Sequence, residues 1–438
     1  MSGLLTDLYE LTMAAGYFEA GKTSEAATFE FSIRRLPRHR NFVLAAGLAQ
    51  AVEYLLNLRF TPEEIGYLRG LPQFARVSSA FFDYLARFRF TGDVFAVPEG
   101  TPVFAGEPVL YVRAPIIEAQ IPETAILSNV TFQTLIASKA ARVVIAGAGR
   151  SVAEFGTRRA HTPEAGTLGA RAAYIGGCNG TSNTLAGLRF GIPVFGTSAH
   201  SWVLSFPSEM QAFRQLQELL GEHTVQLVDT YDVLEGVSTA AKLGPPLWGI
   251  RIDSGDLVTL SRAARAILDA KGLDQTKIMV SGDLDEYKIR DLISVGAPVD
   301  AFGVGTELAT SGDAPSMGSV YKLVELESGG AIRYTAKFSP DKNTLPGRKQ
   351  VFRFRDHDLL ALADEPPPEG GRALLRRVIV NGELIEPLPD PKALKKHAQR
   401  AIEELPPTLR ELECGASFPV GRSPALERLI EQTRRDLE

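Results

Sequence analysis

The sequence predicts an α/β protein in which an irregular parallel β/α barrel is inserted into a discontinuous α+β sandwich domain built from both chain ends. From about residue 148 to 310, apolar strand-like runs that end in small, polar or charged residues alternate with helix-like segments, as in successive βα units. Runs rich in β-formers and separated by turns occur on both sides of this region, at 91–113 and again at 319–386. The chain of 438 residues is also too long for one ordinary core, so two or three domains are expected.

The domain boundaries follow from this change of pattern. We expect an N-terminal α+β domain over 1–147 and the barrel domain, with the candidate site, over 148–318. The segment 319–438 would return to the α+β domain and end in a charged helical tail. Six or more βα units in a row favour a closed parallel barrel. A doubly wound open sheet is the alternative interpretation, because it is built from the same units.

Elements outside the barrel region are predicted from hydrophobic periodicity. Residues 4–19, 43–58 and 62–70 have the spacing of apolar residues that is typical of helices. Residues 28–34 alternate between apolar and polar side chains, which predicts a half-buried strand. The Asn-Gly pair at 381–382 lies between two β-rich runs and is a strong signal for a tight hairpin turn.

Composition and charge argue against several classes of protein. The formal net charge of −5 and the pI of about 5.8 argue against a general nucleic-acid binder, since such proteins are usually basic. No stretch approaches the ~18 uninterrupted apolar residues of a membrane span, and the first residues lack the basic region of a signal peptide. Cys178 and Cys414 are too few for a disulfide framework or a four-cysteine zinc site. We therefore expect a cytoplasmic protein that binds neither nucleic acid nor membrane.

Polar residues and glycines collect where the predicted barrel strands end. Parallel barrels perform their chemistry at these carboxyl ends, so the clustering predicts a functional site. The residues concerned are Arg158, Arg159, Thr197, His200, Asp229, Asp232, Arg251, Asp253, Asp256, Gly282, Asp283, Gly303, Gly305 and Thr306.

The residue types in this set fit an anionic ligand. Arg158, Arg159 and Arg251 suit a phosphate or carboxylate, which a guanidinium group binds through two parallel hydrogen bonds. Internal ion pairs with nearby aspartates are the alternative. The glycines of 303–306 follow a strand and suit a phosphate held by backbone N–H groups. His200 lies just past a strand end among these residues, although a lone histidine is more often structural.

The aspartates have two interpretations. Asp229 and Asp253 suit Mg²⁺ bound to a diphosphate, or the orientation of hydroxyl groups and a histidine. Aspartate also caps helices, and Asp256 stands directly before an apolar helix, so a capping role fits it well. The sequence therefore leaves the metal ligands unknown.

Eight short segments resemble the nicotinate phosphoribosyltransferase family, which belongs to a wider group with the nicotinamide and quinolinate enzymes. The segments follow one another from residue 6 to about 350, and this order makes the resemblance specific. They are 6–13, 154–159, 180–184, 196–201, 229–232, 249–256, 303–306 and 345–350.

The resemblance implies a reaction and its participants. Nicotinate and 5-phosphoribosyl 1-diphosphate would give nicotinate mononucleotide and diphosphate in NAD salvage, with Mg²⁺ present. ATP would be hydrolysed as a co-substrate through a phosphohistidine, which falls on His200. The resemblance also implies a homodimer with shared active sites.

The resemblance implies roles for individual residues as well. Catalysis would depend on His200, on Asp229 as its hydrogen-bond partner, and on Arg251. Nicotinate would be contacted by Arg251, by Thr197 and by Tyr9 from the partner subunit, and Asp253 would face the ribose or its metal. The phosphate groups would be lined by Arg158, Gly282, Gly303, Gly305 and Thr306.

Two features of the sequence have more than one interpretation. The nicotinamide enzymes have an aspartate about where Asn183 falls, so an uncharged Asn183 would tolerate the carboxylate of nicotinate. The basic segment 34–41 either binds a phosphate or is a solvated rim. Alternatives to a nicotinate enzyme are a quinolinate or nicotinamide phosphoribosyltransferase and a non-catalytic sugar-phosphate-binding barrel.

Overall fold

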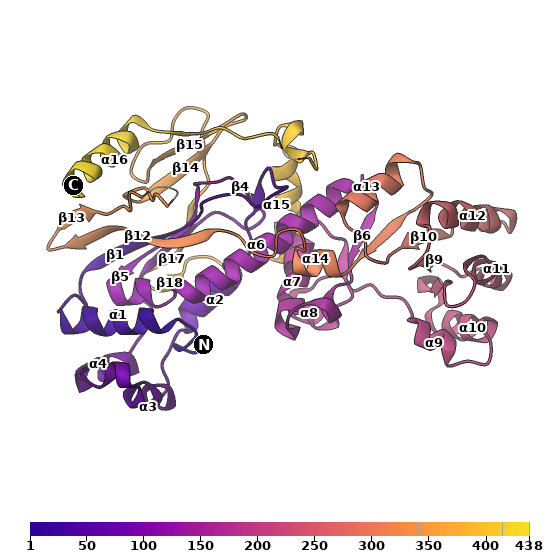
Figure 1. Ribbon diagram of the computed structural model, residues 1–438, viewed down its shortest axis with the longest axis horizontal. Helices are drawn as coiled ribbons and strands as arrows, with labels where there is room; N and C mark the ends of the chain where they lie inside the picture. The colour runs from indigo at the N-terminus through magenta and orange to yellow at the C-terminus, as the bar shows by residue number, and fades with distance from the viewer. Residues whose placement is uncertain (340–341, 414, 438) are drawn as a thin grey trace. The chain divides into compact units, whose positions relative to one another are not determined.

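The computed structural model describes residues 1–339, 342–413 and 415–437, and its chain divides into two units (Figure 1). The first unit contains both ends of the chain, and each unit has a sheet of its own. The first unit comprises Met1–Leu135, Ser316–Pro389 and His397–Glu438, and the second comprises Ile136–Pro315 and Asp390–Lys396.

Strands from both ends of the chain form one antiparallel sheet in the first unit. Its order is β13 (Ala331–Tyr334), β12 (Ser319–Ser328), β1 (Ala26–Ile33), β5 (Pro108–Pro115), β3 (Asp93–Ala96), β17 (Arg376–Val380) and β18 (Glu383–Leu384). The strand predicted at 28–34 is therefore confirmed as β1, shifted by one or two residues. Segments that are far apart in the sequence share this sheet, whereas the predicted sandwich arrangement stays a prediction.

The Asn-Gly hairpin joins β17 to β18 as predicted. Val380 pairs with Glu383 across the turn, and Asn381 and Gly382 have φ angles of 50° and 77°. Two left-handed residues in a two-residue turn match the twist of the flanking strands. A Cβ on Gly382 would lie 2.5 Å from the carbonyl oxygen of Phe90, so this position requires glycine.

The helices of the first unit confirm two of the three predicted helices closely. The first five helices of this unit are α1 (Leu8–Glu19), α2 (Leu48–Asn57), α3 (Pro62–Gly70), α4 (Ser79–Ala86) and α5 (Ile116–Gln120). The predictions over 4–19 and 62–70 correspond to α1 and α3. The helix predicted over 43–58 is too long, because Val43–Leu44 pair with Pro102–Val103 as β2 and β4. Gly47, with a φ of 94°, separates β2 from α2, and a Cβ there would lie 2.5 Å from the carbonyl oxygen of Asn129.

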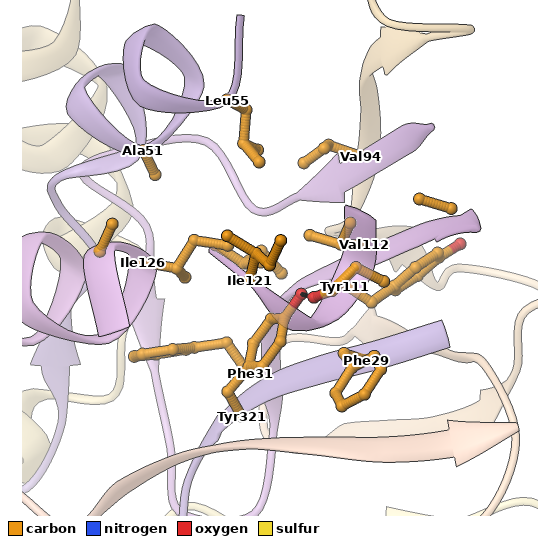
Figure 2. Close-up of a cluster of buried hydrophobic side chains, with 14 of the residues drawn as sticks. Phe29, Phe31, Ala51, Leu55, Val94, Tyr111, Val112, Ile121, Ile126 and Tyr321 are labelled. Carbon is orange, nitrogen blue, oxygen red and sulfur yellow. Dashed lines mark hydrogen bonds between the residues drawn. The ribbon is translucent and has the colours of Figure 1, made fainter. Parts of the chain in front are cut away.

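Aromatic side chains from β1, β5 and β12 form the centre of the first unit's core (Figure 2). Phe31 and Tyr321 are fully buried, and Phe29 stacks on Tyr321 with ring centroids 5.2 Å apart. The Tyr321 hydroxyl donates to the carbonyl oxygen of Ala119 at 2.7 Å, so this buried polar atom has a partner. Burial of each such ring contributes about 1.5–3 kcal/mol, and the stack joins strands from opposite ends of the sequence.

A smaller sheet and most of the C-terminal helical region complete the first unit, whereas Asp390–Lys396 belong to the second. The sheet has the order β16 (Arg372–Ala373), β14 (Lys349–Arg353), β15 (Asp358–Leu362) and β19 (Val420–Arg422). The predicted tail at 391–412 forms α15 (Pro391–Glu403) and a short 3-10 turn after Pro406, and α16 (Pro424–Leu437) follows. The helical tail and its break at the proline pair are therefore confirmed.

The second unit contains a six-stranded parallel sheet, which confirms the predicted α/β class. Its order is β7 (Gly180–Thr181), β6 (Ser151–Glu154), β11 (Ala301–Val304), β10 (Lys277–Val280), β9 (Gly249–Ile252) and β8 (Val225–Leu227). Helices follow the strands in the chain. The helices are α7 (Pro163–Ile175), α8 (Thr184–Phe190), α9 (His200–Leu204), α10 (Glu209–Leu220), α11 (Val233–Leu243), α12 (Leu257–Ala270), α13 (Glu286–Ser294) and α14 (Thr306–Thr310), and α6 (Glu123–Ala146) contains the boundary between the units.

This parallel sheet is open. Within the described residues β7 and β8 are its edge strands, and Val194 adds a single parallel bridge to Thr181 beyond β7. Among the described residues β7 and β8 are not hydrogen-bonded to each other, so the six strands do not form a closed ring. The predicted closed barrel is therefore not confirmed, and an open parallel sheet describes the hydrogen bonding.

Two further predictions concern the helices and the cysteines. Of the helices in the described ranges, none is long and apolar enough to cross a membrane. Cys178 is fully buried, and its burial, with the charge of Glu154, raises the pKa of the thiol to about 12. Cys414 lies outside the described residues.

Candidate active site

Arg251 is the centre of a hydrogen-bonded group at the carboxyl ends of the strands. Its Nε donates to Ser281 Oγ at 2.7 Å, and its Nη1 donates to Thr197 Oγ1 at 2.6 Å. Its Nη2 donates to Asp253 Oδ1 at 2.7 Å, which is the internal ion pair that the sequence left open. Within the described residues these contacts engage fewer than the five N–H groups of a guanidinium, so Arg251 can still bind an anion.

Asp253 is the negative charge that accompanies Arg251. Burial raises the pKa of its carboxyl group, but hydrogen bonds from Arg251 and Ser281 and the charges of Arg251 and His200 outweigh burial and lower the pKa. The carboxylate is therefore ionised at neutral pH. It fixes the guanidinium in one orientation at the carboxyl ends of the strands.

Asp229 connects this group to His200. Its Oδ2 accepts hydrogen bonds from the Asp253 backbone N–H at 3.0 Å and from Ser254 Oγ at 2.7 Å. Its buried Oδ1 lies 3.9 Å from His200 Nε2, which is longer than a hydrogen bond. The other imidazole nitrogen, Nδ1, lies 3.2 Å from Thr230 Oγ1. The structure thus brings His200 and Asp229 together, with the His200 side chain 42% exposed and the Asp229 side chain fully buried.

Glycines allow the backbone to pass close to this group. Gly282 has a φ of 95°, and a Cβ there would overlap the carbonyl oxygen of Asp253. A Cβ on Gly303 would lie 2.6 Å from the ring of Phe155. Gly305 and Thr306 follow at the first turn of α14, where the Thr306 side chain is exposed. Gly282 and Thr306 are exposed at the strand ends, whereas Gly303 is buried within β11.

Glu154 anchors the turn that carries Arg158 and Arg159. The buried carboxylate accepts a hydrogen bond from the Thr181 hydroxyl at 2.5 Å and a short one from the Gly156 N–H. Burial raises its pKa, and these hydrogen bonds and the charge of Arg158 oppose the rise. The short turn Thr157–Arg159 then presents both arginines to solvent, where an anion can reach them.

Several of the predicted residues have other contacts. Asn183 is buried, and its side-chain oxygen accepts the Ala186 N–H at 2.8 Å as the cap of α8. Asp232 and Asp256 cap α11 and α12 in the same way, which confirms the capping interpretation of Asp256. Tyr9 lies in the first unit and is 47% exposed. Its burial and the carboxylates of Glu123 and Glu10 raise the pKa of its hydroxyl group.

Sequence reasoning missed three residues of this site. Phe155 lies with its ring centroid 5.9 Å from the Arg251 guanidinium carbon, and Ser281 binds both Arg251 and Asp253. Glu154 holds the arginine turn, as described above. The alternation of Ser151, Ala153 and Phe155 along β6 signals that Phe155 faces the same side as the other site residues.

A cavity of about 460 Å³, which we call the inner cavity, adjoins Arg251 and Thr197. Its wall is mostly apolar, with polar groups at its two ends. The lining residues are Ser151, Ala153, Phe155, Val194, Phe195, Gly196, Thr197, His223, Val225, Trp248, Met279, Ala301 and Phe302. Arg251 does not line the inner cavity but contacts two residues that do, Thr197 and Phe155. An apolar pocket beside a fixed cation suits a flat aromatic carboxylate.

The aspartates offer little for a resident metal ion. Among the described residues there is no group of three or more histidine, cysteine or acidic side chains that could hold one. Asp253 Oδ1 is already bound by Arg251 and Ser281. Mg²⁺ in phosphate-handling sites is often held by one or two carboxylates together with the substrate's phosphates. The residues present therefore fit a Mg²⁺ ion that is carried by a diphosphate substrate.

The basic segment 34–41 lies in the first unit. Arg34 and Arg35 line a cavity of about 250 Å³ together with Lys322 and Arg422. Glu30 lies in the same wall and forms an ion pair with Lys349 at 3.0 Å. The two arginines thus face a polar hollow rather than a flat solvated rim.

The fold and the site describe an α/β protein with arginine, aspartate and glycine residues gathered at the carboxyl ends of parallel strands. Residues 4–131 match the nicotinate phosphoribosyltransferase (NAPRTase) N-terminal domain, and residues 150–333 match the nicotinate phosphoribosyltransferase family. The chain is 45% identical over 434 residues to a nicotinate phosphoribosyltransferase of Mycobacterium tuberculosis, and the match covers 97% of this chain and 92% of that protein. The chain belongs to the nicotinate phosphoribosyltransferase family.

Solved structures agree with this assignment. Human nicotinic acid phosphoribosyltransferase superposes with a TM-score of 0.81 at 31% identity, over 98% of this chain and 100% of that one. A nicotinate-nucleotide pyrophosphorylase from Pyrococcus furiosus superposes with a TM-score of 0.76 at 27% identity, over 92% and 95% of the two chains. The similarity therefore extends over both units.

Proposed function

We propose that this chain transfers the phosphoribosyl group of 5-phosphoribosyl 1-diphosphate to nicotinate, which gives nicotinate mononucleotide and diphosphate in NAD salvage. The observation that carries the proposal is the position of Arg251. Its guanidinium lies beside the Phe155 ring and binds Thr197, and both of these residues line the apolar inner cavity. Arg251 can therefore bind the carboxylate while Phe155 contacts the pyridine ring. The family of the chain supports the same substrates.

The chemistry needs charge stabilisation more than covalent catalysis. The pyridine nitrogen attacks C1 of the ribose, the bond from C1 to the diphosphate oxygen breaks, and the diphosphate departs with that electron pair. Donors aimed at the leaving oxygens lower this barrier. Arg158 on its exposed turn and the exposed Gly282 and Thr306 fit this role, and we assign Gly303 and Gly305 to the same phosphate sites. Mg²⁺ bound to the diphosphate would supply further neutralisation of its negative charge.

The proposal includes coupling to ATP through His200. The imidazole is exposed enough to meet a phosphoryl donor, and a buried carboxylate and a hydroxyl lie next to its two nitrogens. Transfer of the γ-phosphoryl group would break its bond to ADP and form a bond to imidazole nitrogen, and hydrolysis would later release phosphate. Asp229 would orient the ring, since the carboxylate is itself fixed by Asp253 and Ser254.

Tyr9 enters the proposal through a homodimer. Its side chain is 47% exposed, and Leu5, Leu8 and Met13 are also exposed on or next to α1. A contiguous exposed apolar face is typical of a protein interface. We propose that a second copy of the chain covers this face and that Tyr9 reaches the partner's nicotinate site.

Product formation from nicotinate, 5-phosphoribosyl 1-diphosphate and Mg²⁺ tests the proposal, with and without ATP, for wild type and His200→Ala. The expected result is mononucleotide formation that ATP stimulates in the wild type and not in the variant. Product that ATP does not affect would remove the phosphohistidine and leave the transferase. The absence of mononucleotide under every condition would overturn the transferase itself.

A further inference from the structure

The inner cavity is larger than the proposed substrate requires. Cavities of ~300–1,000 Å³ hold drug-sized ligands, and the inner cavity of about 460 Å³ lies within that range. A single pyridine ring with one carboxylate fills only part of it. The lining spans the whole length of the strands, from Phe155 and Thr197 at the carboxyl end to Ser151, Val225 and Trp248 at the amino end.

The space arises from small side chains on the inner face of the sheet. Gly303, Ala153 and Gly180 are paired in register across β11, β6 and β7, so they share one face. Ala301 is in register with Met279 on β10 and lies on the same face as Gly303, two residues further along β11. Parallel barrels usually fill this region with bulky branched side chains. Here the small side chains of Ala153 and Ala301 line the inner cavity, whereas the rings of Phe155 and Phe195 occupy the space beside Gly303 and Gly180.

The wall of this space is apolar and partly exposed. Val194, Phe195 and Trp248 line the inner cavity and are each more than two-fifths exposed. A ligand that covers exposed apolar side chains stabilises its complex by about 25 cal/mol for each Å² of apolar surface removed from water. The inner cavity therefore favours an apolar group over water.

The proposed reaction fixes the direction in which a ligand would extend. Arg251 holds the carboxylate, and the pyridine nitrogen must face the sugar-phosphate residues at the carboxyl ends of the strands. The ring edge away from the nitrogen then faces the amino end of the sheet, toward Ala301 and Trp248. A substituent on that edge would enter the apolar part of the inner cavity.

We infer that the inner cavity is a binding site for pyridine-3-carboxylates that carry an apolar substituent on the ring edge away from the nitrogen. This inference rests on the proposed function, because Arg251 and the direction of attack orient the ring. The ligand class is an aromatic carboxylate with an alkyl or aryl group. Arg251 binds its charged end, and Ala153, Met279 and Ala301 contact its apolar end.

Calorimetry on the full chain tests the inference with pyridine-3-carboxylate and its 5-phenyl derivative as probes. The quantity to compare is the ratio of their two Kd values in each protein. In the wild type the phenyl compound should bind about tenfold more tightly, which is 1.4 kcal/mol. Ala301→Leu should bring the ratio close to one, because the leucine side chain occupies the space of the phenyl group. Ala301→Val is the milder variant if the leucine prevents folding.

Ala241→Leu is the matched control. Ala241 is a buried residue of α11 that does not line the inner cavity, so the added bulk should leave the ratio of Kd values near ten.

A Trp202→Phe background isolates the fluorescence of Trp248, and only the phenyl probe should shift its emission. Trp202 lies outside the lining and donates to the Ala212 carbonyl oxygen.

The outcomes separate the inference from the proposed function. If nicotinate binds and is converted while the phenyl compound binds more weakly than nicotinate in the wild type, the inference is wrong and the transferase stands. If the phenyl compound binds tightly, Ala301→Leu abolishes its advantage and nicotinate is not converted, the inner cavity is confirmed and the proposed function fails. An unchanged ratio in Ala301→Leu would also overturn the inference.

Discussion

At the scale of the residue, the site depends on a few side chains with several partners each. Arg251 is bound by Thr197, Ser281 and Asp253, and Asp253 is in turn linked to Asp229. The sequence indicated most of these residues, because charged residues at strand ends are conspicuous. It did not indicate Ser281, since a serine after a strand is common and its two contacts depend on the fold.

Arg251→Lys tests whether the guanidinium geometry matters. A lysine keeps the charge but cannot donate to three partners and a carboxylate at once. Loss of about 1.5–3 kcal/mol for a charged hydrogen bond corresponds to a rise of roughly 10- to 100-fold in the KM for nicotinate. Steady-state kinetics at saturating 5-phosphoribosyl 1-diphosphate measure this. An unchanged KM would exclude Arg251 as the carboxylate ligand.

Asn183→Asp tests the hypothesis about ring selectivity. Aspartate caps helices as well as asparagine does, so α8 should keep its cap and the fold should persist. The new carboxylate should repel nicotinate and lower its kcat/KM about tenfold or more relative to nicotinamide. An unaltered preference for nicotinate would show that the cap is the whole role of Asn183.

At the scale of the element, strand ends and turns were easier to predict than contacts between elements. The hairpin at 381–382 and the helix α3 follow from local turn and capping residues, which act within a few positions. The helix was wrongly predicted to begin at residue 43, because β2 there pairs with β4, about sixty residues away. Closure of the parallel sheet is likewise non-local, and periodicity within each βα unit does not reveal it.

Gly282→Ala tests the close approach of β9 and β10. The new methyl group would collide with the Asp253 carbonyl oxygen, and its φ of 95° is unfavourable for alanine. We expect a loss of about 2–3 kcal/mol in unfolding free energy and at least about a 100-fold loss of activity. Gly296→Ala is the control, since its φ is 66° but a Cβ there meets open space. Equal effects in the two variants would contradict the role of the contact.

The raised pKa of Glu10 in α1 predicts how the stability of the fold depends on pH. Burial, together with the charge of Glu123, raises the pKa of Glu10 from 4.5 to about 7, although hydrogen bonds from Thr124 and Asp7 oppose the rise. A carboxyl group with a raised native pKa stabilises the fold fully below its unfolded pKa and loses that contribution as pH rises through the native value. The free energy of unfolding of the wild type should therefore fall between about pH 4.5 and 7 relative to that of Glu10→Gln. Midpoints of chemical denaturation at pH 5 and pH 8 measure the difference, and a gap that is the same at both would refute the assignment.

At the scale of the whole molecule, the family and the parallel sheet were predictable, and the sandwich and dimer stay predictions. Eight motifs carried the family, because their order along the chain makes the resemblance specific. Glu154 and Phe155 lie in one of those motifs, and only the structure shows that one anchors the arginine turn and the other borders the inner cavity. The inner cavity was not predicted, because the number of strands and the side chains that face inward decide its volume together.

The most direct measurement of the central claim is the kcat/KM of the purified full chain for three pyridine bases with 5-phosphoribosyl 1-diphosphate and Mg²⁺. Nicotinate, nicotinamide and quinolinate are compared by chromatography of the mononucleotide product. The account predicts nicotinate mononucleotide as the main product, with a kcat/KM at least about tenfold above the other two. A higher value for nicotinamide or quinolinate, or no mononucleotide from any base, would contradict it.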